Sequence, residues 1–136
     1  MKGYLLKEQR ILIGEAVFIE SNALENNYSV TFEDDTESGY FYGAVKSADT
    51  AELTILDMLH IYDVESIAEA ERPAMLSIVW SADWMKCALV INNYCHAVFD
   101  FENNGAYNRN EFPPPNDIWT KHERKLSEAL IKRLFT

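Results

Sequence analysis

The sequence predicts an α+β fold, in which a twisted, mostly antiparallel sheet of five to seven strands carries a C-terminal helix packed on one face. Three observations predict this fold. Short apolar segments separated by polar turns fill most of the chain, one segment has the pattern of a hairpin, and apolar residues near the C-terminus recur at helical spacing. With 136 residues, the chain is predicted to form a single domain over residues 1–136.

The first half of the chain is predicted to supply three strands, at Glu15–Glu20, Tyr28–Glu33 and Tyr40–Lys46. The second of these alternates, with Tyr28, Val30 and Phe32 on one face. The next segment, Asp49–Val64, is ambiguous, because leucines three residues apart favour a short helix first and alternation from Met58 favours extended chain afterwards. A helical turn at Ser66–Glu71 and strands at Met75–Ser81 and Tyr107–Phe112 complete the prediction.

The segment Cys87–Phe101 predicts a β-hairpin at the centre of the sheet. Two apolar runs flank Asn92-Asn93, and asparagine tolerates the positive φ that a two-residue turn requires. With that turn, Cys87 pairs with Val98, and Cys87 and Cys95 point to opposite faces of the sheet. A turn one residue longer would return both to one face, but out of register. We therefore expect two buried free thiols rather than a disulfide.

The C-terminal region predicts a stiff connector followed by the helix. Pro113–Pro115 can neither pair in a sheet nor lie inside a helix. Apolar residues after it fall at helical spacing, which predicts a helix over Ile118–Phe135, and Thr120 and Glu123 have the spacing of a capping box.

The net charge of −10 is concentrated in one region of the chain. Between Ile11 and Glu71 there are fourteen acidic residues and one basic residue, Lys46, whereas the tail from Lys121 onward carries a net positive charge. Such a field repels nucleic acid and anionic membranes and attracts basic proteins. A solvated acidic surface that serves solubility alone is the competing interpretation.

No motif in the sequence predicts catalysis, a metal site or a cofactor. The five glycines form no phosphate-binding loop, and no Gly-x-Ser-x-Gly, His-Glu-x-x-His or Cys-x-x-Cys pattern occurs. Alternation places His96, Asp100 and Glu102 on one strand face, where they could line a small-ligand or acid–base pocket, although His96 and Asp100 would lie roughly 13 Å apart. A strand end that emerges into solvent is the simpler explanation of these residues.

The chain resembles a bacterial family, domain-of-unknown-function family 2251. The resemblance rests on the stretches Ala88–Glu102 and Ala106–Pro115, and on Leu59–Val64 and Ser77–Ser81 before them. It implies a small bacterial soluble protein and supplies no catalytic residues. Cys95 stands where the resemblance leads us to expect proline, and Asn108 where it leads us to expect cysteine.

The leading functional hypothesis is a small acidic binding protein of the immunity type, which neutralises a cognate bacterial toxin and is not an enzyme. A nuclease is the expected target, because an acidic surface can cover a basic phosphate-binding site. The expected contacts are Glu33, Asp34, Asp35, Glu37 and Trp84, the last as an exposed turn tryptophan. The alternative hypothesis is a ligand-binding protein or enzyme that uses His96, Asp100 and Glu102.

These hypotheses carry further expectations about partners and location. The expected partner is a basic protein, with no nucleic acid, membrane or metal, and the protein itself is expected to be a monomer or a weak homodimer. An opening without the apolar run of a signal peptide favours the cytoplasm. A third reading, a structural or oligomeric protein whose acidity serves solubility, also remains open.

Overall fold

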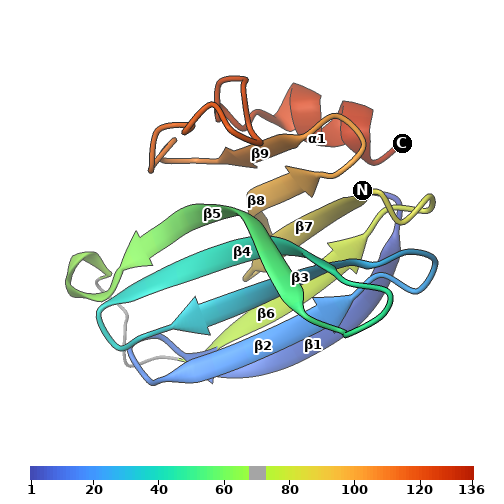
Figure 1. Ribbon diagram of the computed structural model, residues 1–136. Helices are drawn as coiled ribbons and strands as arrows, with labels where there is room; N and C mark the ends of the chain where they lie inside the picture. Colours follow the sequence, from blue (N-terminus) through green and yellow to red (C-terminus); the bar gives the residue numbers. More distant parts are fainter. Residues whose placement is uncertain (68–72) are drawn as a thin grey trace.

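The computed structural model describes residues 1–67 and 73–136 and shows a sandwich of two antiparallel sheets (Figure 1). The five-stranded sheet has the order β1-β6-β7-β8-β9, with strands at Tyr4–Leu12, Pro73–Trp80, Lys86–Ile91, Tyr94–Asp100 and Gly105–Asn108. The four-stranded sheet has the order β2-β3-β4-β5, with strands at Val17–Asn22, Tyr28–Asp34, Ser38–Lys46 and Leu53–Asp63. A 3-10 turn at Val64–Ser66 follows β5, and a short helix, α1, occupies Glu128–Leu134.

The predicted antiparallel sheet and C-terminal helix are both present, but the described residues contain nine strands in two sheets rather than five to seven in one. The two sheets face each other across an aromatic core, in which the Phe41 ring of β4 lies 5.4 Å from the Phe99 ring of β8. Alternation identifies the buried face of each strand but not the sheet on which that face packs. The division into two sheets is therefore decided by tertiary packing.

The helix predicted at the start of Asp49–Val64 is wrong, because Leu53–Asp63 forms one continuous strand, β5. Its register against β4 shifts at two bulges. A bulge inserts one extra residue and breaks the strict alternation that identifies a strand in sequence, which explains why the leucine spacing imitated a helix. The helical turn predicted at Ser66–Glu71 lies largely outside the described residues.

The central hairpin is confirmed. Asn92 and Asn93 have φ values of 51° and 64°, as a two-residue turn with positive φ at both positions requires. A bulge in the β7–β8 pairing places Cys87 opposite Phe99 rather than Val98. The two cysteines nevertheless lie on opposite faces of the sheet and are free, with Cys87 in the core between the sheets and Cys95 beneath the helix.

The outer face of the five-stranded sheet is partly covered by the C-terminal helix. Phe135 and Ile131 pack on Ala88, Cys95 and Val98. This helix begins at Glu128 rather than Ile118, with the Ser127 side chain accepting a hydrogen bond from the Leu130 amide at 3.1 Å. Likewise, the strand predicted at Tyr107–Phe112 is found earlier, at Gly105–Asn108.

The helix begins later than predicted because residues 113–127 follow an irregular path. This path brings Arg124 into a buried ion pair. The Arg124 guanidinium, 2% exposed, donates two hydrogen bonds to the Asp57 carboxylate of β5, at 2.9 and 3.0 Å. Thr120, predicted as a helix cap, instead donates its hydroxyl to Asp57. Arg124 also donates to the carbonyls of Pro113 and Ala106. One buried cation thus joins β5, the polyproline segment and β9.

We predict that Arg124→Ala lowers the free energy of unfolding by about 3–5 kcal/mol, because it leaves the Asp57 carboxylate buried without its counter-ion. The matched control is Lys46→Ala, which removes the half-exposed ion pair with Glu20 and should cost less than about 1 kcal/mol. Urea denaturation measures both values. Equal losses in the two variants would show that Arg124 is not the anchor of the C-terminal segment.

Candidate partner-binding surface

Three loops of the acidic region meet at one end of the sandwich: residues 13–16, 35–37 and 63–67. The Gly14 amide donates to the Asp34 carboxylate at 2.7 Å, and the Val64 amide donates to the Glu37 carbonyl at 2.8 Å. The Ser38 hydroxyl donates to Asp63 at 2.8 Å. These hydrogen bonds hold the loops against one another and form a contiguous surface, which we call the acidic loop end.

Five exposed carboxylates belong to the acidic loop end, and its three loops contain no lysine or arginine: Glu15, Asp35, Glu37, Asp63 and Glu65. Between two of these loops lies a hollow of about 510 Å³, lined by Thr36, Glu37, Ser38, Asp63, Val64 and Glu65. Carboxylates that converge on one hollow favour occupation by a cationic group. A lysine or arginine side chain of a partner protein has the required charge.

Local hydrogen bonds keep two of these carboxylates ionised. The amides of Ser38 and Glu37 donate to Asp35 and lower the pKa of its carboxyl. The pKa of Asp63 is also lowered, because His60 Nε2 lies 2.9 Å from Asp63 Oδ1 and the Ser38 hydroxyl donates to the same oxygen. These two carboxylates therefore stay negatively charged below the usual titration range of aspartate.

Of the predicted contact residues, Asp35 and Glu37 are exposed on this surface, whereas Asp34 is not. Asp34 is 1% exposed, and its carboxylate accepts hydrogen bonds from Gly14, Thr36 and the Tyr62 hydroxyl. Burial and the bond to Asp34 raise the pKa of Tyr62. Asp34 thus organises the loops from beneath, so it is unavailable to a partner.

Glu33 and Trp84 also differ from the exposed contacts that were expected. Glu33 is half-buried on the outer face of β3 and accepts a hydrogen bond from the Tyr42 hydroxyl at 3.0 Å. Burial and this carboxylate raise the pKa of Tyr42 to about 12. Trp84 is 8% exposed and stacks on Tyr4 with ring centroids 4.9 Å apart. The expectation of an exposed turn tryptophan is therefore wrong.

Sequence reasoning missed Glu15, Asp63 and Glu65 as members of this surface. They come from loops far apart in the chain, and only the pairing of the strands brings them to one end. The burial of Asp34 was predictable from the sequence, because Asp34 continues the alternation that points Val30 and Phe32 into the core.

The three residues of the alternative pocket have separate partners. Asp100 is 2% exposed and accepts hydrogen bonds from the amides of Glu102 and Asn103. Glu102 forms an ion pair with Lys86 at 2.9 Å. His96 packs edge-on against Tyr94, and burial together with the Arg109 charge lowers its pKa to about 4. Asp100 therefore stabilises the turn that follows β8, and Glu102 in this turn is tied to Lys86 of β7.

The two cysteines are buried, which determines the state of their thiols. Burial raises the pKa of Cys95 to about 11 and that of Cys87 well above its ordinary value, so both thiols stay protonated. Within residues 1–67 and 73–136, no group of three His, Cys, Asp or Glu side chains is placed to hold a metal ion. The helix in these ranges is too short to cross a membrane.

Comparison with known proteins identifies relatives without assigning an activity. An uncharacterized protein of Haemophilus influenzae is 38% identical over 124 residues, which cover 88% of this chain and 75% of the relative. No solved structure matches the chain. Residues 11–135 match the family model described as "Uncharacterized protein conserved in bacteria (DUF2251)", as the resemblance in sequence implied. The chain therefore belongs to the bacterial DUF2251 family.

Proposed function

We propose that this protein is an immunity-type inhibitor, a small binding protein whose acidic loop end covers the basic active site of a cognate bacterial toxin. The observation that carries the proposal is the convergence of three loops that carry five exposed carboxylates without a lysine or arginine, three of which (Glu37, Asp63 and Glu65) line one hollow. The positive charge of the toxin's active site would complement the negative charge of the acidic loop end.

Electrostatics supports a basic active site as the target. A nuclease must hold phosphates, so its active site concentrates lysine and arginine. A surface of the opposite sign accelerates encounter and fixes the orientation of the complex. In this proposal, Glu37, Asp63 and Glu65 receive one cationic side chain in the hollow, and Asp35 and Glu15 extend the contact around it. Blocking the phosphate site then inhibits the toxin without any chemical step.

The position of the contact can be tested by charge reversal. We predict that Glu37→Lys/Glu65→Lys weakens binding to the cognate toxin roughly tenfold or more, because it places like charges against the basic site. Neither side chain forms an ion pair within the described residues, so the variant should fold. The probe is a panel of purified bacterial nuclease-toxin domains carrying inactivating substitutions, with affinity measured at low and high salt.

The matched control is Glu25→Lys/Glu52→Lys, which changes the net charge equally at the opposite end of the sandwich. Those two residues are exposed, and their loops are joined by a hydrogen bond from the Lys46 amide to the Asn27 carbonyl. This control should bind with nearly wild-type affinity. Equal weakening by both double variants would implicate net charge instead of the acidic loop end. Failure of the wild-type protein to bind any basic toxin of the panel would contradict the proposal.

The lowered pKa values predict how binding depends on pH. A carboxyl whose pKa is lowered stays anionic as the pH falls through the ordinary aspartate value of about 3.9. We therefore expect the contribution of Asp35 and Asp63 to the affinity for the toxin to be unchanged between about pH 7 and pH 5, and to fall only below about pH 4. Asp35→Asn should reduce affinity by a similar factor at every pH in that range. A loss of binding already near pH 6 would indicate that a histidine controls the contact.

A further inference from the structure

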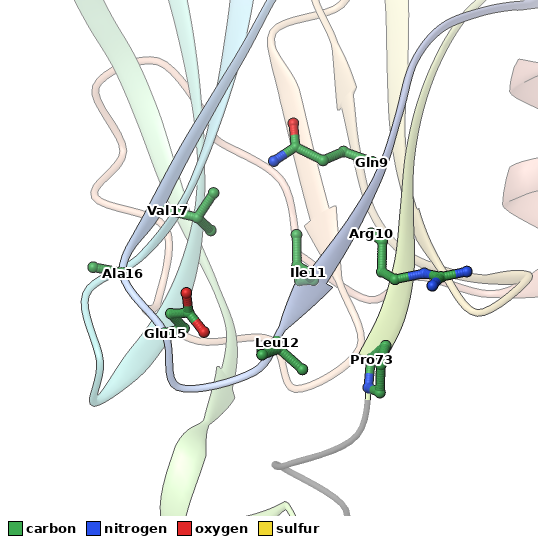
Figure 2. A pocket seen from close by; sticks show the side chains of 8 residues that line it. All are labelled: Gln9, Arg10, Ile11, Leu12, Glu15, Ala16, Val17 and Pro73. Carbon is green, nitrogen blue, oxygen red and sulfur yellow. The ribbon is translucent and has the colours of Figure 1, made fainter.

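On the same side of the sandwich, each sheet ends in an edge strand that has a free side within the described residues. Among the described residues, β1 pairs with β6 only and β2 pairs with β3 only. Figure 1 shows these two strands together at the bottom of the molecule. A pocket of about 370 Å³ lies where they meet, and Figure 2 shows the Gln9 side chain extending from β1 toward β2 while Arg10 points away. As far as residues 1–67 and 73–136 show, this side of the sandwich is therefore open.

The hydrogen bonds of the neighbouring strands reveal which β1 groups face the open edge. The Met75 carbonyl of β6 accepts from the Asn92 amide at 2.9 Å, so the main-chain polar groups of Met75 point toward β7. Arg10 lies opposite Met75, and by alternation its own N–H and C=O point away from β6. The same holds for Glu8, opposite Ser77, so in the described part of the chain both residues present unpaired main-chain groups at the edge.

This orientation restricts how two copies of β1 can pair. In an antiparallel pair, residues that bond across the new edge must both have main-chain groups that face it. Three of the registers that satisfy the rule have the two-fold axis at Glu8, at Arg10 or at Gln9. The first places Glu8 opposite Glu8 of the second copy, and the second places Arg10 opposite Arg10, which both bring like charges together. The third, with Gln9 on the two-fold axis, places Glu8 opposite Arg10 twice.

We propose that β1 is a self-pairing edge, through which a second copy of this chain extends the five-stranded sheet across a two-fold axis at Gln9. Glu8 and Arg10 are both exposed and have no ion-pair partner within the described residues. Each Glu8–Arg10 pair across the axis would form two main-chain hydrogen bonds and one ion pair between the side chains. The inference does not depend on the proposed function, because it uses a different surface.

The features of β1 limit this pairing to one closed dimer. A bulge between Leu5 and Lys7 interrupts the strand on one side of the axis, which prevents register slippage in that direction. An isologous contact uses the same edge on both copies, so the dimer leaves no free β1 edge for further growth. The added strand also lies beside the open pocket between β1 and β2.

Charge exchange across the axis tests the proposal. Sedimentation velocity of the full chain over a range of concentrations should reveal a reversible dimer. Glu8→Arg and Arg10→Glu should each weaken dimerisation roughly tenfold or more, because each replaces two attractive pairs by two repulsive ones. The double variant Glu8→Arg/Arg10→Glu should restore the wild-type dimer, since the attraction is regained with its signs exchanged. Glu25→Arg, which reverses an exposed charge in the loop between β2 and β3, is the matched control.

A second variant tests the main-chain part of the contact. Glu8→Pro removes an N–H that points to the open edge and no hydrogen bond to β6, so it should abolish the dimer and keep the fold, as circular dichroism would verify. A monomer at every concentration would overturn the proposal. A dimer that survives both single charge reversals, or that the double variant fails to restore, would equally overturn it.

Discussion

The ion pair between Asp57 and Arg124 is the constraint on which the arrangement of the C-terminal third depends. Both side chains are almost fully buried, and a buried charge is tolerated only when its partner and the remaining hydrogen bonds are in place. Arg124 meets this requirement with the Asp57 carboxylate and two carbonyls. Arg124 reaches these acceptors from an irregular segment, residues 113–127. The ion pair therefore sets both the path of this segment and the late start of α1.

A second buried carboxylate has a comparable role at the acidic loop end. Asp34 accepts hydrogen bonds from the first and second loops and from Tyr62 of β5. The exposed carboxylates above it repel one another, so this surface needs internal hydrogen bonds to remain ordered. The bonds to Asp34 supply some of them, and Ser38 supplies the others through its amide bond to Asp35 and its hydroxyl bond to Asp63. A surface that is held in shape before binding loses less conformational entropy when a partner binds, which supports the proposed role in recognition.

The central hairpin was predictable from the sequence, whereas strands β1 and β5 were not. The hairpin at Cys87–Phe101 was predictable because two apolar runs and Asn92-Asn93 specify a two-residue turn within a few residues. By contrast, β1 was missed, since Lys7, Glu8, Gln9 and Arg10 interrupt the apolar pattern of an edge strand that is exposed on both faces. Strand β5 was missed for a different reason, because two bulges break its alternation. The acidic character of the candidate surface was evident, but two of its five expected contacts are buried.

The sequence by itself determined the antiparallel strands, the central hairpin, the free cysteines on opposite faces and the regional excess of negative charge. These properties depend on local alternation, turn chemistry and composition, which neighbouring residues specify. Only the tertiary structure decided the division into two sheets, the partners of Asp57 and Arg124, and the meeting of three loops at one end. Each of these depends on contacts between residues far apart in the chain, and local patterns carry no information about which distant groups meet.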